Sequence, residues 1–325
     1  MIRRLAMAAM LAGLGSAAAS TAAVAQEVYP TRAVRIVVGF PAGSATDITT
    51  RIYAEKLSAH FNQRFIVENM PGAAANLAAA HVARGPADGY TLYVSTNANS
   101  ISVHLYRKLN YRFPDDFVPI ATMVSVPTVM AAAPQFKPST VKDVIALAKE
   151  KPGEVTYGSA GVGTGPQLAG ELFVAMSQIK LTHVPYKGTN EALGDLMTGR
   201  ISLLFAALPV VSAHIHDGRL KALGITTGQR SDLAPDIPTI AESGLPGFDV
   251  LLWFGLSAPR GTPDSAVRAV AAAVESIQKE DDTRKRLATV GADVLSRTLG
   301  DFARFIDADI PKWGKAVEHS GLKID

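Results

Sequence analysis

Residues 34–48, VRIVVGFPAGSATDI, join an apolar run to a turn and a helix start. Pro41 and Gly43 end the apolar run, and Ser44 with Asp47 three residues later has the pattern of a capping box. A helix that begins here directs its free amide groups into the turn, where they can bind an anion. Because the turn contains no cation, its chemistry favours a carboxylate held by backbone amides and hydroxyls.

Three further loops place small or hydroxylated residues between a predicted strand and a predicted helix, at 95–99, 158–164 and 187–190. Ligands of open α/β sheets lie outside the carboxyl ends of the strands. We therefore expect these loops to face one cleft together with residues 41–47. Taken singly, each loop could equally be a plain turn before a capped helix.

Two of these loops carry a further signal. Thr164 and Gln167 form a second predicted capping box, with Pro166 in the first turn of the helix. Lys187 follows a predicted strand near the cleft, where it either attracts an acidic ligand or is an ordinary surface lysine.

Motifs for other chemistries are incomplete in this chain. The G-x-G at 161–163 lacks the third glycine of a dinucleotide site, and neither a P-loop nor a G-x-S-x-G elbow occurs. His214 and His216 are too few for a zinc site without further ligands. The S-x-x-K match at 139–142 is typical of a helix start capped by Ser139. The sequence therefore favours binding over catalysis, and we expect no cofactor and no metal.

The composition is that of a compact globular protein, because 48% of the 325 residues are hydrophobic and the formal net charge is only +3. This balance gives no reason to expect a nucleic acid or an anionic membrane as partner. The chain has no cysteine, which excludes disulfides, thiolate chemistry and a lipoprotein anchor.

The N-terminus has the pattern of an export signal. Arg3 and Arg4 precede an apolar centre, and small residues follow up to the A-x-A sequence at 23–25. The strongly apolar part is shorter than the roughly 20 residues that a membrane anchor needs. We therefore expect residues 1–25 to be removed, the mature chain to begin near Gln26, and the protein to be located in the periplasm.

Strand-like runs alternate with helix-like runs along the rest of the chain, which predicts an α/β fold with parallel sheets. An apolar stretch at 120–133 is broken by Pro127, and another at 220–226 precedes a loop rich in proline and aspartate. We interpret both stretches as hinge crossings between two lobes. The predicted lobes are residues 26–125 with 224–325, and residues 126–223.

The predicted elements outside the crossings follow from the same periodicities. Predicted strands lie at 34–38, 64–68, 90–95, 154–157, 183–186, 201–205 and 253–258. Predicted helices lie at 76–84, at 137–151 with its start at Ser139, and at 263–279, 282–290 and 299–320. Further helices are expected directly after Ser44 and Thr164.

Several motifs, taken in order, make the chain resemble one protein family from Tyr29 to Leu322. They include FPAGSATD at 40–47, ENMPGAAAN at 68–76, YGSAGVGTGPQLAGELF at 157–173, HVPYKGTNEAL at 183–193 and WFGLSAPRGTP at 253–263. On these motifs the chain resembles the receptors of tripartite tricarboxylate transporters, the Bug-type group of periplasmic solute-binding proteins. The resemblance implies a type II periplasmic-binding-protein fold, whose two α/β lobes close over a small organic acid and present it to a membrane permease.

The resemblance also implies where the ligand binds. In the family, the first loop holds a ligand carboxylate through backbone amides and ordered waters, and further contacts come from the other cleft loops and from the segment after the strand that ends at Phe205. Together with cleft positions 167, 187 and 188, this gives as candidate ligand-binding residues Phe40, Ala42, Gly43, Ser44, Ala45, Thr46, Asp47, Ser95, Thr96, Asn97, Ser159, Ala160, Gly163, Thr164, Gln167, Lys187, Gly188 and Ala206.

This chain departs from the family pattern at several positions. Family glycines are replaced by Ala42, Ser44, Ala45, Ala74 and Ala75. Gln167 stands where a histidine is common, and Ala206 stands where the family usually has an acidic residue. Without that residue the chain lacks a partner for a ligand ammonium or hydroxyl group. These departures favour a dicarboxylate or an aromatic carboxylate without an amino group, such as a terephthalate-like acid.

Two alternative functions stay open at this point. A ligand-sensing subunit of a membrane signalling protein would use the same closure of two lobes. A periplasmic hydrolase or isomerase would need a nucleophile and a base, for which His183 on a predicted strand is the one histidine to consider. As a transport receptor, the protein is expected to be a monomer whose partners are a small carboxylate and the permease subunits.

Overall fold

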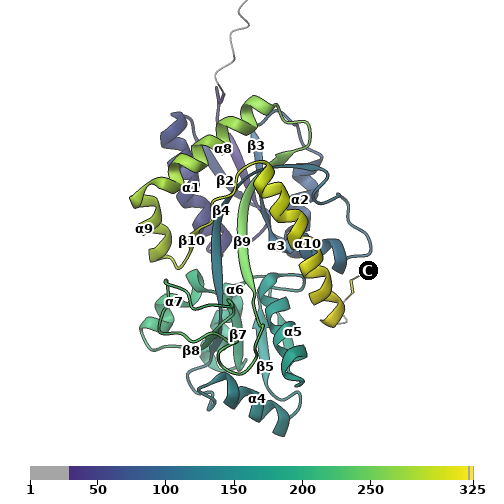
Figure 1. Ribbon diagram of the computed structural model, residues 1–325, viewed down its shortest axis with the longest axis vertical. Helices are drawn as coiled ribbons and strands as arrows, with labels where there is room; N and C mark the ends of the chain where they lie inside the picture. Colours follow the sequence, from purple (N-terminus) through teal and green to yellow (C-terminus); the bar gives the residue numbers. More distant parts are fainter. Residues whose placement is uncertain (1–28, 321–322, 325) are drawn as a thin grey trace, which may run out of the picture.

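The computed structural model describes residues 29–320, 323 and 324, so the predicted export signal lies outside the described residues. Two α/β lobes stand one above the other in Figure 1, and two long strands run between them. The alternation of strands and helices confirms the α/β class predicted from the sequence. Within the described chain, no helix has both the length and the apolar character needed to cross a membrane.

The upper lobe is built on parallel strands, with β1 (Val34–Val38) between β2 (Phe65–Asn69) and β3 (Thr91–Thr96). Successive β1 side chains face opposite layers, since Ile36 packs in one apolar cluster and Val37 in another. The helices of this lobe are α1 (Ala45–Phe61), α2 (Asn76–Ala83), α3 (Asn97–Leu105), α8 (Asp264–Lys279), α9 (Asp281–Thr289) and α10 (Gly300–Ser320). The bounds of α2, α8, α9 and α10 lie within one residue of the predicted ones, and α1 begins directly after Ser44 as predicted.

The lower lobe repeats this plan with β5 between β6 and β7, all three parallel. Its strands are β5 (Thr156–Ser159), β6 (Thr182–Pro185), β7 (Leu203–Ala207) and β8 (Lys221–Ile225). Its helices are α4 (Val141–Glu150), α5 (Gly165–Ser177), α6 (Thr189–Thr198) and α7 (Leu208–His216). The helix α5 begins directly after the loop at 158–164, as the sequence predicted, and α6 begins at Thr189, inside the loop predicted at 187–190.

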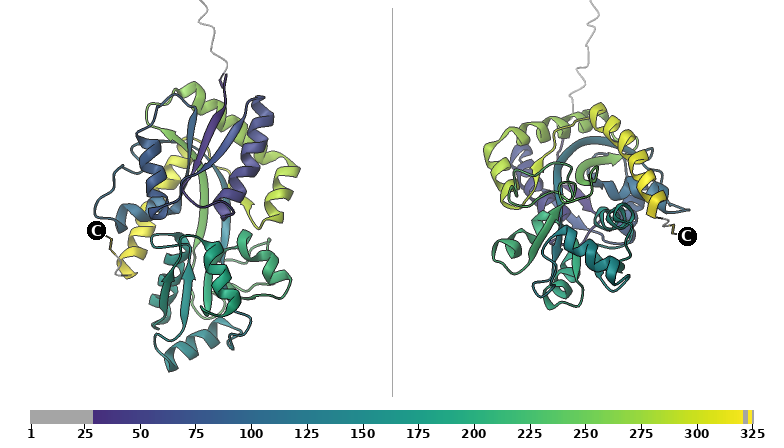
Figure 2. Two further views of the ribbon diagram at one scale, coloured as in Figure 1. Left: turned by 180° about the vertical axis from the view of Figure 1, so that it is seen from behind. Right: turned by 60° about the horizontal axis from the view of Figure 1, so that its bottom comes forward.

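The crossings between the lobes are the strands β4 (Phe117–Ala132) and β9 (Leu251–Pro259), which run antiparallel to each other. Pro127 does not interrupt β4, contrary to the expected break. It marks the place where β4 changes partner, because Pro127 still pairs with Leu251 of β9 whereas Thr128 already pairs with Ala207 of β7. Both crossings are visible from behind in Figure 2. The sheet is therefore mixed, and its antiparallel pairs are made by the strands that leave and re-enter each lobe.

The segment 220–226 does not return the chain to the upper lobe as predicted. Its strand β8 pairs with residues 129–132 of β4, beside the strands of the lower lobe. The chain that follows stays there, since Phe248 and Val250 pack in the same apolar cluster as Phe173 of α5. We therefore propose that residues up to about 250 belong to the lower lobe and that β9 is the return crossing.

Helix α4 begins two residues later than the predicted start at Ser139. Thr140 is the N-cap, and its Oγ1 accepts from the Asp143 amide at 3.1 Å while Asp143 Oδ2 accepts from the Thr140 amide at 3.0 Å. Ser139 donates through its amide and its hydroxyl to the same Asp143 carboxylate. The S-x-x-K match thus forms a capped helix start, although threonine and not serine is the cap.

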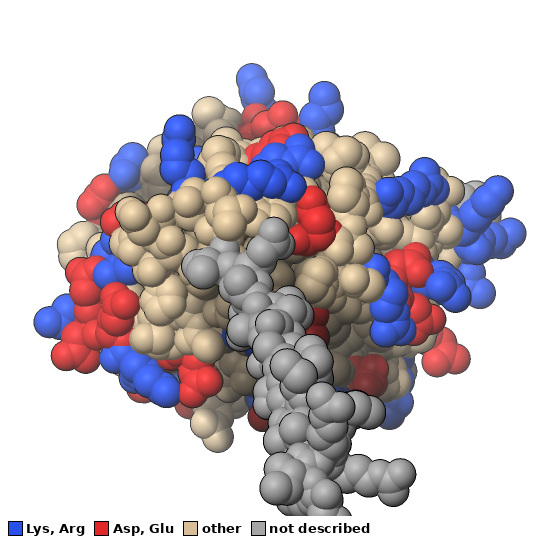
Figure 3. Space-filling view, turned by 90° about the horizontal axis from the view of Figure 1, so that it is seen from above, with Lys and Arg blue, Asp and Glu red and all other residues tan. Residues whose placement is uncertain are grey.

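The charges on the top face of the molecule are interspersed. Lysines and arginines alternate with aspartates and glutamates around this face, and neither sign gathers into one patch there (Figure 3). On the surface of the described chain, exposed charges form pairs such as Arg268 with Asp264 of α8. Exposed pairs of this kind contribute on the order of 0–1 kcal/mol each to stability.

Candidate ligand-binding site

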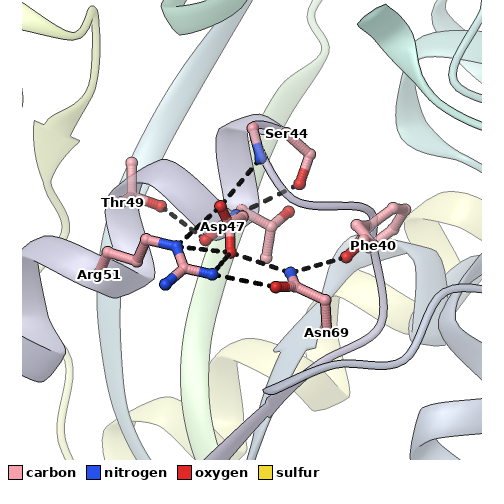
Figure 4. A network of polar contacts seen from close by, with 8 residues as sticks. Phe40, Ser44, Asp47, Thr49, Arg51 and Asn69 are labelled. Atoms are coloured by element: carbon pink, nitrogen blue, oxygen red, sulfur yellow. Dashed lines mark hydrogen bonds and ion pairs between the residues drawn. The ribbon is translucent and has the colours of Figure 1, made fainter. Parts of the chain in front are cut away.

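Asp47, in the first turn of α1, organises the loop that follows β1 (Figure 4). Its side chain is only 4% exposed. It accepts hydrogen bonds from the Gly43 amide at 2.9 Å, from Arg51 Nε at 3.0 Å and from Asn69 Nδ2 at 2.9 Å. Asn69 Nδ2 also donates to the Phe40 carbonyl at 3.0 Å, which ties the end of β2 to the start of the loop. The turn thus already contains one anion, the buried Asp47 carboxylate, which is bound by groups of the protein itself.

The electrostatics of Asp47 make it a positioning residue. Burial alone would raise the pKa of Asp47, but the hydrogen bonds from Arg51, Gly43 and Asn69 outweigh burial and hold the pKa below its ordinary value. The predicted capping box is half formed. Ser44 Oγ accepts from the Asp47 amide at 3.3 Å, whereas Asp47 returns to the Gly43 amide and not to Ser44. Arg51 supplies the cation that the turn itself lacks.

The first two amides of α1 are left for a ligand. The Ser44 amide donates to the Pro41 carbonyl at 3.2 Å, and the Ile48 amide donates to the Ser44 carbonyl at 2.9 Å. For the amides of Ala45 and Thr46, the described residues offer no acceptor. Free amides in the first turn of a helix attract anions. Within the first turn of α1, these two amides are therefore the ones left to bind an anion.

Ala45 and Thr46 line an enclosed cavity of about 40 Å³, the inner cavity. Asn97, the first residue of α3, lies on the same cavity and is 3% exposed. Its Nδ2 is buried and has no hydrogen-bond partner within the described part of the chain. Leaving such a donor unsatisfied costs about 1–3 kcal/mol, so this position favours an acceptor inside the cavity.

The inner cavity brings together half of the predicted site. The candidate residues that line it are Phe40, Ser44, Ala45, Thr46, Thr96, Asn97, Ala160, Thr164 and Gly188. Residues outside the predicted candidate set also line it: Pro41, Ala98, Gly165, Pro166, Thr189, Ala207, Leu252 and Phe254. Leu252 and Phe254 lie on the crossing strand β9. Phe254 belongs to the motif at 253–263, but neither side chain has a polar group that would have marked it as a ligand contact.

A second cavity of about 590 Å³, the outer cavity, adjoins the inner one. The two cavities share Phe40, Pro41, Ala160 and Thr164. Lys187 and Glu191 bring one charge of each sign to the outer cavity. Its remaining wall is largely apolar and aromatic, formed by Gly39, Pro71, Gly72, Ala73, Ala74, Ala75, Tyr106, Gly161, Val162 and Tyr186.

The loop before α5 differs from its prediction. Thr164 is the N-cap, but its hydroxyl donates to the Gly161 carbonyl at 2.7 Å. Gln167 Oε1 accepts from the Gly163 amide at 2.8 Å, and not from the amide of Thr164. The second capping box is therefore wrong, because the glycine turn places the Gly163 amide within reach of Gln167. Gln167 is 1% exposed and holds the loop from behind.

Ser95 and Ser159, two hydroxyl candidates, are engaged inside the protein. Ser95 Oγ lies 2.8 Å from Ser257 Oγ, between the paired strands β3 and β9. Ser159 Oγ lies 2.8 Å from His183 Nε2, and burial lowers the pKa of His183 to about 4. The His183 ring also stacks on Tyr157, with ring centroids 4.7 Å apart. Both hydroxyls are therefore used in hydrogen bonds to other protein side chains next to the cleft loops.

Ala206 lies on the other face of β7 from the cleft. It packs in an apolar cluster with Val129 and Ile225, and its neighbour Ala207 lines the inner cavity. Successive residues of a strand point to opposite faces, which explains why one alanine replaces the other in the cavity wall. The apolar wall expected at this strand end is therefore present, but position 207 supplies it.

Glycines of the lower lobe allow the two lobes to meet closely. A Cβ on Gly188 would lie 3.1 Å from Pro41 Cγ, and a Cβ on Gly163 would lie 3.2 Å from Ala74 Cβ. At Gly165 the fit is tighter, with 2.3 Å to Asn97 Nδ2 and 2.3 Å to Leu252 Cδ2. Real Cβ atoms do not approach other atoms this closely, so a side chain at position 165 would force the ends of the Asn97 and Leu252 side chains to move.

A family model described as "Tripartite tricarboxylate transporter family receptor" matches residues 49–322. The chain belongs to this family. The Bordetella pertussis protein BugT is 31% identical over 323 residues, which cover 98% of this chain and 99% of BugT. A Pseudomonas sp. (strain P51) protein from the tcbD-tcbE intergenic region is 31% identical over 311 residues, which cover 95% of this chain and 93% of that protein.

Solved structures of related proteins are similar to this chain in fold as well as in sequence. An R. palustris protein with adipate is 34% identical, with a TM-score of 0.88, and covers 91% of this chain and 99% of its own. MatC from Rhodopseudomonas palustris with bound malate is 33% identical, with a TM-score of 0.83, and covers 89% of this chain and 100% of its own. The periplasmic binding protein BugD is 30% identical, with a TM-score of 0.86, and covers 91% of this chain and 99% of its own. The protein is thus a solute-binding receptor of a periplasmic family and not an enzyme.

Family membership explains the turn η1 (Ala73–Ala75) in the wall of the outer cavity. All three alanines have positive φ angles, of 46°, 52° and 71°. A left-handed conformation costs about 1–2 kcal/mol for each residue with a Cβ, a cost that the glycines expected at positions 74 and 75 from the family resemblance would avoid. In this chain the Ala74 methyl group instead faces Gly163 across the cleft.

Replacing Asp47 by asparagine is expected to lower the free energy of unfolding by about 2 kcal/mol at neutral pH, because hydrogen bonds to a charged group contribute roughly 1.5–3 kcal/mol. The pKa of Asp47 is lower in the folded protein than in the unfolded chain. Its stabilisation is therefore fully present above the unfolded pKa of about 3.9 and is lost as the pH falls through the folded value. Urea denaturation of both proteins between pH 7 and pH 3 tests this.

The matched control for this prediction is Asp264→Asn, at the start of α8. Asp264 also pairs with an arginine four residues on, but its side chain is 74% exposed. We expect its effect on the free energy of unfolding to stay below about 0.5 kcal/mol. Equal effects of the two substitutions would contradict the special role of the buried carboxylate.

Proposed function

We propose that this receptor captures a small dicarboxylate or aromatic carboxylate without an amino group and delivers it to the permease subunits of a tripartite tricarboxylate transporter. The observation that carries the proposal is the buried, unpartnered Nδ2 of Asn97, which lies on the inner cavity together with Ala45 and Thr46. A carboxylate oxygen satisfies Asn97 Nδ2 and the two free amides at the same time.

The rest of the two cavities supports a ligand with an apolar body. Leu252, Phe254 and Ala207 line the inner cavity, and alanines and tyrosines dominate the wall of the outer one. Lys187 at the outer cavity can attract a second carboxylate. Apolar surface in contact with the ligand gains about 25 cal/mol per Å², whereas a ligand ammonium group would lose water without gaining a strong partner.

Capture follows from the two-lobed architecture. Residues of the upper lobe and of the lower lobe line the same inner cavity, so a ligand there contacts both lobes. A ligand that binds the closed arrangement better than the open one shifts the hinge equilibrium toward closure. We also propose that residues 1–25 export the chain to the periplasm and that the receptor is a monomer.

A thermal-shift panel of carboxylates tests the proposed function. The panel contains adipate, malate, terephthalate and benzoate, with aspartate and glutamate as amino-bearing counterparts. Adipate and malate are included because related proteins have been solved with them. An acid at a hundredfold excess over its Kd should stabilise the protein by about 2.7 kcal/mol.

Two results would count against the proposal in different ways. A panel in which no acid raises the melting temperature contradicts carboxylate capture. Tighter binding of aspartate or glutamate than of malate, measured by calorimetry, contradicts only the preference for ligands without an amino group.

A further inference from the structure

Asp309, in the middle of α10, joins the only two tryptophans of the chain. Asp309 is 7% exposed. Its Oδ2 accepts from Trp253 Nε1 at 2.9 Å, and its Oδ1 accepts from Trp313 Nε1 at 3.0 Å. Both tryptophans are at most 2% exposed. One buried carboxylate thus uses one oxygen for each of two indole groups.

The two tryptophans belong to different parts of the molecule. Trp253 lies on the crossing strand β9 and packs in the upper-lobe cluster with Tyr93 and Phe302. Trp313 packs in the cluster that contains Phe173 of α5 in the lower lobe. The Asp309–Trp313 hydrogen bond lies within α10 and orients the Trp313 ring that packs on the lower lobe, whereas the Asp309–Trp253 bond ties α10 to the crossing strand β9.

Helix α10 packs along α3 of the upper lobe and α5 of the lower lobe. In Figure 1 it runs from the upper lobe down toward the lower one. The helix α3 begins at Asn97 and α5 begins at Gly165, and both residues line the inner cavity. Any movement that separates these two helix starts must loosen either the contact of α10 with α3 or the packing of Trp313 and α10 on the lower lobe.

The packing around Asp309 leaves space on both sides. A cavity of about 600 Å³ is lined by Trp253 and Asp309, and another of about 320 Å³ is lined by Trp313. Lys312 and Asp249 line both of these cavities. Because solid packing does not fill the junction, the two indole hydrogen bonds are well placed to set how firmly α10 holds the lower lobe.

We infer that Asp309 is a positioning residue for ligand capture: its hydrogen bonds hold α10 on the crossing strand β9 and hold the Trp313 ring against the lower lobe, and so favour the closed cleft. The inference rests on the proposed capture by closure. Beyond the proposed capture, the inference states that Asp309, which lies outside both ligand cavities, controls the ratio of closed to open molecules.

The test measures the distance between the lobes without a ligand. Because the chain has no cysteine, Ala272→Cys on α8 and Lys149→Cys on α4, both exposed, introduce the only two labelling sites. Distances between spin labels at these sites report the closed and open populations. We expect Asp309→Asn to lower the closed-to-open ratio by about tenfold, the effect of losing one hydrogen bond to a charged group.

Two further variants separate a hinge effect from simple loss of structure. Trp313→Phe keeps most of the ring but removes one indole N–H, so it should shift the ratio in the same direction even where Asp309→Asn folds poorly. Asp301→Asn removes an exposed acid of the same helix that pairs with Arg304, and should leave the ratio unchanged. Unchanged distances in both Asp309→Asn and Trp313→Phe would overturn the inference.

Because these distances are measured without a ligand, they do not depend on the carboxylate panel. A shift in the two variants together with a panel that never binds would support the hinge role of Asp309 and reject the proposed ligand class. Binding of a panel acid together with unchanged distances in the two variants would support the proposed ligand class and reject the hinge role of Asp309.

Discussion

Replacing Asn97 by alanine is expected to lower the affinity for the best-binding acid of the panel by about tenfold to a hundredfold. Asn97 Nδ2 is buried on the inner cavity without a partner among the described residues, so a ligand carboxylate is its natural acceptor. A hydrogen bond to a charged group contributes about 1.5–3 kcal/mol, and each 1.4 kcal/mol corresponds to a factor of ten. Isothermal titration calorimetry of parent and variant measures the loss directly.

The ligand-free protein provides the control for Asn97→Ala. Since Nδ2 makes no hydrogen bond within the described chain, its removal should leave the melting temperature without ligand unchanged or slightly higher. Asn97→Asp keeps the size of the side chain but places a carboxylate against the ligand carboxylate, and should reduce affinity further. Unaltered affinity in both variants would exclude Asn97 from the binding site.

Local patterns predicted most elements of the fold, because apolar periodicity and turn residues act over short distances. The strand β1 and the helices α2 and α8 lie within one residue of their expected bounds. The crossing strands were harder to interpret. Pro127 has the sequence appearance of a strand end, but the change of partner from β9 to β7 at this residue depends on tertiary pairing.

The two predicted capping boxes show why the details of the site were only partly readable. Both follow the same spacing, yet Ser44 accepts from the Asp47 amide whereas the Thr164 hydroxyl donates to Gly161. The difference lies in the backbone of the second loop, where Gly161 and Gly163 have φ angles of 120° and 82°. Glycine allows many such conformations, so the sequence does not specify which amide the Gln167 side chain will reach.

The strand β7 shows how a small error in length moves a residue out of a site. The predicted strand ended at Phe205, and Ala206 was expected to face the ligand. The strand extends to Ala207, and alternation along it places Ala206 in the core and Ala207 on the inner cavity. The chemical conclusion, an apolar wall, is unaffected because both residues are alanine.

Replacing Gly165 by alanine is expected to lower the affinity for the same panel acid by about a hundredfold. The new Cβ would lie 2.3 Å from Asn97 Nδ2, across the cleft, and 2.3 Å from Leu252 Cδ2 on the crossing strand β9. Such overlap costs about 1–3 kcal/mol, occasionally more, and opening the cleft relieves it without disturbing either lobe. Calorimetry should therefore show weak binding, and small-angle scattering should show a larger radius of gyration with saturating ligand.

Gly194 provides a matched control on the neighbouring helix α6. A Cβ at this position meets nothing within 4 Å in the described chain. Gly194→Ala should leave affinity unchanged and stabilise the protein by up to about 1 kcal/mol, because alanine is the better helix former. If Gly165→Ala also binds as tightly as the parent, the contact between the lobes at Gly165 is not needed for capture. Weak binding by Gly165→Ala with an unchanged melting temperature would instead locate the defect in closure, because both lobes would still be folded.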